Sequence, residues 1–403
     1  MNLLLDYTDT QIGNVEITIS GSKSESNRLL ILQQWYANLQ LDNVSDSDDT
    51  KHLTQALNTK DVLIDIGHAG TAMRFLTAYF SVLDGREIVL TGSERMQNRP
   101  IKVLVDALRS LDADIEYIDK EGYPPLRIKG KKLTKGKVRI NGNVSSQYIS
   151  ALLLVAPSLE NGLELELVEE ITSRPYLEMT LTLLNKLGIS TTFAGNHIKI
   201  NPKKEIEDKT IVIESDWSSA SYFYSLVALS EVGTTIKLSS YRKESLQGDS
   251  CLVAIYKKFG VKTMFQEHAI LLTKNTHNSQ LITLNLKDAP DLAQTIAVTC
   301  FGLGLSCNLT GLHTLKIKET DRLVALQCEL QKLGATIEIT DTSLHLKSAT
   351  MIQKKGTIQT YNDHRMAMAF APLAIKVPII IENAEVVTKS YTGFWEDLKK
   401  CFF

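Results

Sequence analysis

Polar turns rich in arginine, lysine, hydroxyl and amide groups recur along this sequence, each followed by an apolar stretch. The first lies in "ISGSKSESNRLLILQQW", residues 19 to 35, where Ser24 is predicted to cap a helix and Lys23 and Arg28 add two cations near its start. A capped helix start presents backbone N–H groups and a partial positive charge, which together suit phosphate or carboxylate. Taken alone, the stretch is explained equally well by a surface helix with two solvated cations.

A nucleotide phosphate loop does not explain this stretch. The Walker A motif needs a glycine directly before the lysine and another glycine five residues earlier. Here Ser22 precedes Lys23, and the earlier position is Ile17. The sequence therefore disfavours a kinase or an ATPase, but it leaves an anion site open.

Further turns of this kind follow along the chain. They contain Gly70, Thr71 and Arg74; Arg95 and Arg99; Ser145, Ser146 and Gln147; Ser173, Arg174 and Tyr176; Asp291; Lys318, Glu319 and Arg322; Asp363, His364 and Arg365; and Lys389. Arginine suits bidentate contacts with phosphate or carboxylate, so this composition predicts a small substrate with several anionic groups.

Asp291 and Glu319 are carboxylates in turns that are otherwise mostly cationic or neutral. A carboxylate in such surroundings is a candidate general acid or base. The alternative is that each forms an ordinary ion pair with a neighbouring lysine or arginine, and spacing alone favours that alternative.

Length and composition limit the classes of protein to consider. The chain has 403 residues, of which 43% are hydrophobic and 22% charged, with a formal net charge of −2. These values are typical of a globular protein of two or three domains and argue against a nucleic-acid coat. Five cysteines without a C-x-x-C motif favour a reducing cytoplasm, and the histidines lack metal-ligand spacing. The start "MNLLLDYTDT" does not resemble a signal peptide, and no apolar run reaches transmembrane length.

An internal repeat explains how the polar turns are positioned. Ser145, Ser218, Asp291 and His364 are spaced 73 residues apart, and each lies in a short polar turn before a strongly apolar helix. Between these helices lie four more amphipathic segments, "VDALRSLDADI", "MTLTLLNKLGIS", "LVAIYKKFGVK" and "LQCELQKLGATI". Three of the four have a glycine at their C-terminal end, as helices often do. Short β-branched runs such as "NHIKI", "KTIVIES" and "ATIEI" are predicted strands.

The repeated unit is therefore strand, buried helix, strand, amphipathic helix, strands. Six units predict an α/β protein built by repetition, and helices that are apolar on nearly all faces favour closed domains in which sheets surround them. If the turns converge, several positive helix ends would face one crevice.

The order of the motifs resembles the EPSP synthase family of enolpyruvyl transferases, 3-phosphoshikimate 1-carboxyvinyltransferases. The resemblance rests on "SGSKSESNR", "GHAGTAMR", "LTGSERMQNRPI", "VSSQYISALLL", "SRPYLEMTL", "ESDWSSASYF", "SLQGD", "KETDRL" and "YNDHRMAMAF", and it spans the chain from about residue 13 to Lys389. Together these motifs are highly specific, although each alone would be weak.

The resemblance implies two domains of three βαβαββ-type units each, an inside-out α/β barrel whose domains close over a cleft. It implies one domain at 20–215 and another formed by 1–19 with 216–403. It implies transfer of the enolpyruvyl group of phosphoenolpyruvate to the 5-hydroxyl of shikimate 3-phosphate, in chorismate and aromatic amino-acid biosynthesis. We expect no metal or organic cofactor, no nucleic-acid or membrane partner, a cytoplasmic monomer, and inhibition by glyphosate.

The resemblance also implies roles for single residues. Asp291 resembles the base for the 5-hydroxyl proton, and Glu319 with Lys23 resembles the pair for proton transfer at the methylene carbon. The residues that resemble shikimate 3-phosphate contacts are Lys23, Ser24, Arg28, Ser145, Ser146, Gln147, Ser173, Asp291 and Lys318. Those that resemble the phosphoenolpyruvate site are Lys23, Gly70, Arg99, Gln147, Arg322, Arg365 and Lys389.

Some positions depart from the family pattern, and two other functions compete. His68 stands where an asparagine is usual, and Phe75 replaces a common proline. A transferase acting on UDP-N-acetylglucosamine would have a Lys-Asn pair and a cysteine in the first domain, but Ser24 follows Lys23 and no cysteine precedes Cys251. A non-catalytic anion-binding protein of the same fold would have lost the acidic residues or arginines that are present here.

Overall fold

The computed structural model describes residues 1–276, 281–349, 351–353 and 356–402. The chain divides into two compact units, Gly21–Ile213 and Met1–Ser20 with Glu214–Phe403. The domain limits expected from the sequence, 20–215 and 1–19 with 216–403, stay a prediction. We call the first the contiguous unit and the second the split unit.

The contiguous unit contains three of the small sheets. They are β4-β5-β7-β6, with β4 Leu63–Asp65, β5 Glu87–Thr91, β6 Asp114–Tyr117 and β7 Leu126–Lys129; β10-β11-β9-β8, with β8 Lys137–Asn141, β9 Leu163–Val168, β10 Thr191–Ala194 and β11 His197–Ile200; and β12-β3, with β3 Leu39–Asp42 and β12 Lys209–Val212. Its helices are α1 Lys23–Trp35, α2 Asp48–Asn58, α3 Gly70–Val82, α4 Glu94–Gln97, α5 Lys102–Ser110, α6 Ser146–Val155 with the 3-10 turn η1 Ala156–Ser158, and α7 Arg174–Lys186.

The split unit contains three further sheets among the residues that the structure describes. They are β14-β15-β13-β2, with β2 Val15–Thr18, β13 Thr235–Ser239, β14 Val261–Gln266 and β15 Ala269–Lys274; β16-β17-β19-β18, with β16 Ile282–Asn285, β17 Cys307–Thr310, β18 Ile337–Ile339 and β19 Ser343–Leu346; and β1-β21-β20, with β1 Leu3–Leu5, β20 Gly356–Ile358 and β21 Ile379–Ile381. Its helices are α8 Trp217–Leu229, α9 Leu252–Lys257, α10 Ala293–Gly302, α11 Arg322–Lys332, α12 His364–Phe370 and α13 Phe394–Lys400, with 3-10 turns η2 Gly248–Cys251, η3 Pro290–Leu292, η4 His313–Ile317, η5 Ala371–Ile375 and η6 Ala384–Lys389.

The four-stranded sheets repeat one topology, as the predicted repeat requires. In each, a parallel pair is followed by two antiparallel pairings, for example β16 with β17, β17 with β19, and β19 with β18. The N-terminal strands complete sheets of the split unit, since β2 pairs with β13 and β1 pairs with β21. The predicted α/β fold with repeated units is confirmed.

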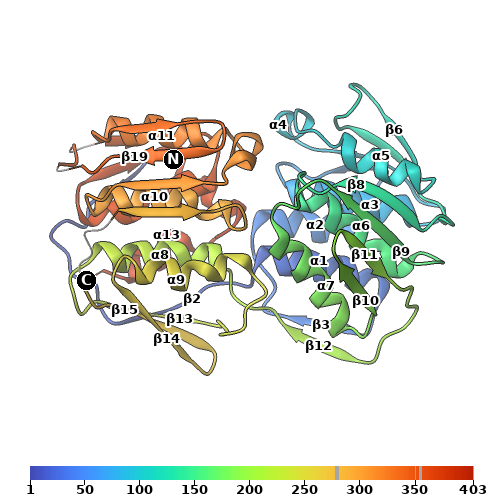
Figure 1. Ribbon diagram of the computed structural model, residues 1–403, viewed down its shortest axis with the longest axis horizontal. Helices are drawn as coiled ribbons and strands as arrows, with labels where there is room; N and C mark the ends of the chain where they lie inside the picture. Colours follow the sequence, from blue (N-terminus) through green and yellow to red (C-terminus); the bar gives the residue numbers. More distant parts are fainter. Residues whose placement is uncertain (277–280, 350, 354–355, 403) are drawn as a thin grey trace. The chain divides into compact units, whose positions relative to one another are not determined.

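The helices that follow the polar turns are buried on nearly all faces, as predicted. In the split unit α8 packs between α10 and the sheet that contains β13 and β15 (Figure 1). On α8 only Ser218 is not buried, and on α6 only Gln147 is not buried. The polar first turns are therefore the parts of these helices that solvent or a ligand can reach.

The cap predicted for the first helix is wrong by two residues. Ser22, not Ser24, is the N-cap of α1, and its side chain accepts a hydrogen bond from the backbone of Glu25. Ser24 lies inside the first turn, where its carbonyl accepts from Arg28 Nη1 at 2.8 Å.

The amphipathic helices end as their sequences indicate. Gly188, Gly260 and Gly334 follow α7, α9 and α11 with φ of 72°, 79° and 96°. The fourth helix, α5, has Asp112 at the corresponding place with φ of 85°. Glycine takes this left-handed conformation without steric cost, which explains the three glycines. Among the described residues, no helix is long and apolar enough to cross a membrane.

Candidate active site

A buried arginine organises the charged groups of the split unit. Arg322, 2% exposed, contacts three carboxylates: Asp363 Oδ2 at 2.6 Å, Asp291 Oδ1 at 2.8 Å and Glu319 Oε2 at 2.8 Å. A planar guanidinium has donors in a fixed fork, so one side chain can orient several acceptors. The two candidate acid–base residues, Asp291 and Glu319, are therefore held by the same cation.

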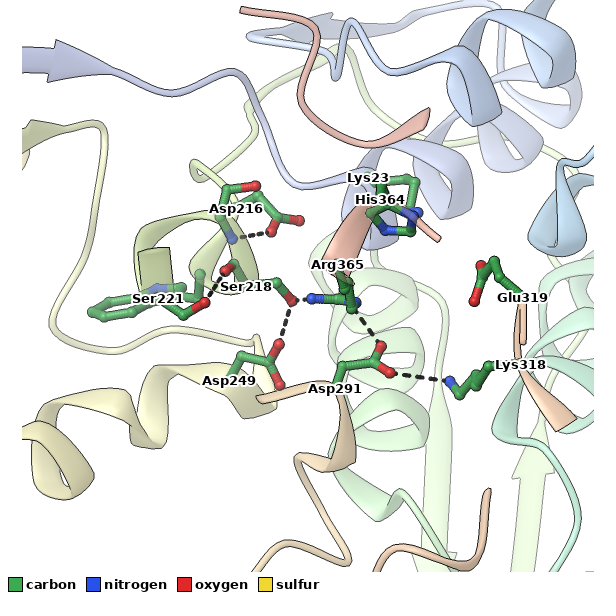
Figure 2. A network of polar contacts seen from close by, with 12 residues as sticks. Lys23, Asp216, Ser218, Ser221, Asp249, Asp291, Lys318, Glu319, His364 and Arg365 are labelled. Carbon is green, nitrogen blue, oxygen red and sulfur yellow. Dashed lines mark hydrogen bonds and ion pairs between the residues drawn. The ribbon is translucent and has the colours of Figure 1, made fainter. Parts of the chain in front are cut away.

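Asp291 lies among further cations. Lys318 Nζ is 3.3 Å from its Oδ1 and Arg365 Nη2 is 3.2 Å from its Oδ2 (Figure 2). Burial acts to raise the pKa of Asp291, but the charges of Lys318, Arg365 and Arg322 outweigh it and hold that pKa well below the ordinary value. Asp291 is therefore a carboxylate at neutral pH.

A strained turn before α12 positions the next two charged residues, Asp363 and Arg365. Tyr361 and Asn362 both have φ of 54°, and Asp363 follows as the N-cap of α12. The Tyr361 hydroxyl donates to Glu329 Oε1 at 2.7 Å, which anchors the turn. Two consecutive left-handed residues other than glycine are costly and need such support. The turn places Asp363 against Arg322 and Arg365 against Asp291.

The remaining predicted residues of the split unit lie in the same group. Lys389 Nζ is 3.1 Å from Glu319 Oε1. His364 is buried, and its Nδ1 lies 3.7 Å from Asp363 Oδ1. Asp291, Lys318, Glu319, Arg322, Arg365 and Lys389 are thus brought together.

In the contiguous unit, Arg28 is buried among neutral acceptors. It donates to Thr180 Oγ1 at 2.8 Å and Ser150 Oγ at 3.0 Å, in addition to the Ser24 carbonyl. Its guanidinium also lies 5.5 Å from the centroid of the Phe75 ring. Burial lowers the pKa of Arg28 to about 10, so it remains a cation at neutral pH. Phe75, which departs from the family pattern, therefore packs against a predicted site residue.

Gly70 and Arg99 are in close contact at the start of α3. A Cβ added to Gly70 would lie 3.1 Å from Arg99 Cζ and closer still to its Nη1. Arg74 on the same helix donates to the Gly70 carbonyl at 3.1 Å. Only glycine lets the Arg99 guanidinium approach this helix end without a shift.

The other predicted residues of this unit lie at helix starts. Ser145 is the N-cap of α6, Ser146 is its first residue, and Gln147 Nε2 donates to Thr71 Oγ1 of α3 at 3.1 Å. Ser173, the N-cap of α7, has φ of 53°. Lys23 Nζ lies 3.5 Å from Asp49 Oδ2. Each set of residues is described within its own unit, and the expectation that all of them line one crevice stays a prediction.

Sequence reasoning missed several contacts of these residues. Asp363, Asp49 and Asp249 received no role, although Asp363 binds Arg322. The 73-residue spacing did contain a signal for Ser218, because Ser218 and Asp291 both bind Arg365.

The fold is that of the enolpyruvyl transferase-like proteins, which are built from repeated α/β units. The EPSP synthase of Acinetobacter baumannii at 2.37 Å has a TM-score of 0.79 and 20% identity, with 100% of this chain and 98% of that chain covered. The enolpyruvyl transferase NikO from Streptomyces tendae has a TM-score of 0.71 and 14% identity, with 99% of this chain and 97% of that chain covered. Both establish the fold alone.

The sequence comparisons define the family within this class. The family model for EPSP synthase, 3-phosphoshikimate 1-carboxyvinyltransferase, matches residues 53–398. The 3-phosphoshikimate 1-carboxyvinyltransferase of Bacteroides fragilis strain YCH46 is 46% identical over 391 residues, 96% of this chain and 95% of that protein. That of Haemophilus influenzae strain PittEE is 36% identical over 424 aligned positions, 95% of each. The chain belongs to the EPSP synthase family.

Proposed function

We propose that this protein transfers the enolpyruvyl group of phosphoenolpyruvate to the 5-hydroxyl of shikimate 3-phosphate and releases phosphate. Family membership supports the reaction. The observation that carries the assignment of residues is the guanidinium of Arg322, which holds Asp291 and Glu319 at 2.8 Å each. Two carboxylates fixed on one cation can serve two separate proton transfers.

The proposed chemistry has two stages that balance in protons. In the first, the 5-hydroxyl oxygen attacks C2 of phosphoenolpyruvate, Asp291 accepts the hydroxyl proton, and C3 gains a proton from the pair of Glu319 and Lys23. In the second, Glu319 takes a proton from C3 as the C2–O bond to phosphate breaks, and the proton that Asp291 accepted passes to the leaving phosphate, which restores Asp291 and the pair of Glu319 and Lys23. Cations that neutralise the leaving phosphate would stabilise the charge that develops.

The low pKa of Asp291 makes it a weak base as long as the neighbouring cations interact only with protein carboxylates. Efficient general bases have pKa values near the working pH. Lys318, Arg322 and Arg365, the cations that lower the Asp291 pKa, are also proposed substrate contacts. Anionic substrate groups would offset the positive charge of these cations and so raise the Asp291 pKa. Base strength would thus increase when the substrates bind.

The remaining predicted contacts complete the proposal. Ser24, Arg28, Ser145, Ser146, Gln147 and Ser173 bind shikimate 3-phosphate, and Gly70, Arg99, Gln147 and Lys389 with the arginines of the split unit bind phosphoenolpyruvate. The two units serve as the two family domains. All five cysteines are without a disulfide, which supports a cytoplasmic protein, and sedimentation or size-exclusion measurements would test whether it is a monomer.

Phosphate release from phosphoenolpyruvate tests the reaction. We expect release that depends on shikimate 3-phosphate and not on UDP-N-acetylglucosamine. The reverse dependence would reject the proposal. Glyphosate is expected to compete with phosphoenolpyruvate in this assay, and insensitivity at millimolar glyphosate would remove that part of the proposal.

A further inference from the structure

The network around Asp291 continues beyond the residues that were assigned a role. Arg365 Nη2 donates to Asp291 Oδ2 and also to Ser218 Oγ, each at 3.2 Å. The Ser218 hydroxyl in turn donates to Asp249 Oδ2 (Figure 2). The chain of contacts therefore runs from a buried carboxylate in the "SLQGD" motif to the candidate base.

The directions of these hydrogen bonds are fixed by chemistry. An arginine has donors only, so Ser218 must accept from Arg365. The single hydroxyl proton of Ser218 is then directed at Asp249, and a carboxylate acceptor polarises that hydroxyl and strengthens its lone pairs as acceptors. Asp249 thus acts on Arg365 through an intermediate serine.

Ser218 lies in the first turn of α8 and Asp249 lies in η2, and these two elements contact each other. Ser218 is the one residue of α8 that is not buried, next to the Asp216 N-cap. Asp249 is 3% exposed in η2, and its Oδ1 has no hydrogen-bond partner among the described residues. A buried carboxylate with half of its acceptor capacity unused is costly for folding, which argues for a role other than stability.

We propose that Asp249 and Ser218 are positioning residues that fix the Arg365 guanidinium for phosphoenolpyruvate. Nη2 is held by two protein acceptors, so rotation of the guanidinium plane is restricted. The proposal rests on the proposed function, because it assigns Arg365 to phosphoenolpyruvate. Asp249 contacts no reacting atom in this scheme and acts only through Ser218.

Steady-state kinetics of the full chain with each substrate varied would test this. We expect Ser218→Ala and Asp249→Asn each to raise the KM for phosphoenolpyruvate about tenfold, as loss of one charge-assisted hydrogen bond predicts. The KM for shikimate 3-phosphate should change less than about twofold, because Arg365 is not assigned to that substrate. Ser218→Thr, which keeps the hydroxyl, should restore the KM for phosphoenolpyruvate.

The double variant Ser218→Ala with Asp249→Asn, together with a matched control, distinguishes a positioning role from a general loss of folding. Because Asp249 acts through Ser218, the double variant should be no worse than either single variant. Ser225→Ala removes a buried hydroxyl of the same helix, whose partner is Thr299 Oγ1 at 2.8 Å, and should leave both KM values unchanged. Additive effects, or equal losses in all variants, would overturn the positioning role. An inactive wild-type protein would instead reject the proposed function.

Discussion

The two units hold their buried arginines in opposite ways. In the split unit, Arg322 contacts three carboxylates. In the contiguous unit, Arg28 donates to hydroxyl and carbonyl oxygens. Burial acts to lower the pKa of each guanidinium, but the carboxylates reverse the effect at Arg322 and raise its pKa, whereas that of Arg28 is lowered to about 10.

We propose that this difference reflects separate roles of the two units. In the proposed function, the carboxylates that balance Arg322 take part in proton transfer, and their pKa values change when anionic substrates bind. The charge of Arg28, which no contacting carboxylate neutralises, would attract an anionic substrate. We therefore expect loss of Asp291 to lower mainly turnover, loss of Arg322 to lower mainly stability, and changes in the contiguous unit to affect mainly substrate affinity.

The largest effect is expected for Asp291→Asn. The amide keeps the shape but cannot accept the hydroxyl proton, so kcat should fall by about 10²–10⁴, the usual contribution of a general base. Both KM values should stay near those of the wild type in the phosphate-release assay. Near-normal turnover would remove Asp291 from the mechanism and would contradict the role in proton transfer proposed for the split unit.

Replacement of each arginine by methionine compares the two units directly. Arg322→Met leaves Asp291, Glu319 and Asp363 without their shared cation and should lower the free energy of unfolding by about 3–5 kcal/mol. Arg28→Met leaves only neutral acceptors and should cost about 1–3 kcal/mol. Urea unfolding followed by circular dichroism would measure both. A larger loss at Arg28 would contradict this account of the difference.

The stability of the split unit should depend on pH through Asp249. Burial raises the pKa of this carboxyl to about 6, with the Arg365 charge opposing. The folded state then binds the proton more tightly than the unfolded chain, so the stability from this group is complete below about pH 4 and is lost as pH rises through about 6. Relative to Asp249→Asn, the wild type should lose up to about 3 kcal/mol of unfolding free energy between pH 4 and 7.

Unfolding of both proteins across this pH range measures the difference, with Asp9→Asn as a control for the loss of an exposed carboxylate. A difference between wild type and Asp249→Asn that stays constant with pH would mean that the Asp249 carboxyl is not perturbed by burial.

The smallest effect is expected for Gly70→Ala. The added methyl group would displace the Arg99 guanidinium, so the KM for phosphoenolpyruvate should rise about tenfold, and kcat should change less. Gly393→Ala is a suitable control, because its Cβ would meet only Asp397 Oδ2 at 3.6 Å. A loss confined to kcat would contradict the proposed role of Gly70 in phosphoenolpyruvate binding.

Local sequence patterns specify the repeat and, through it, some of the candidate site residues. The 73-residue spacing marks Ser218, Asp291 and His364 near the starts of α8, α10 and α12, and three glycines mark the ends of amphipathic helices. These features depend on local periodicity, capping and backbone conformation, which short segments specify. The family motifs added the reaction and the roles of single residues as predictions.

Which charged side chains contact one another depends on tertiary packing within each unit. Arg322 binds Asp363 and Asp291, which lie 41 and 31 residues away in the sequence, and Asp249 reaches Arg365 through Ser218. The Gly70 contact with Arg99 and the Phe75 contact with Arg28 are of the same kind. Such pairings depend on how the packed helices bring distant turns together, and a charged residue in a turn does not specify its partner, because every turn offers several.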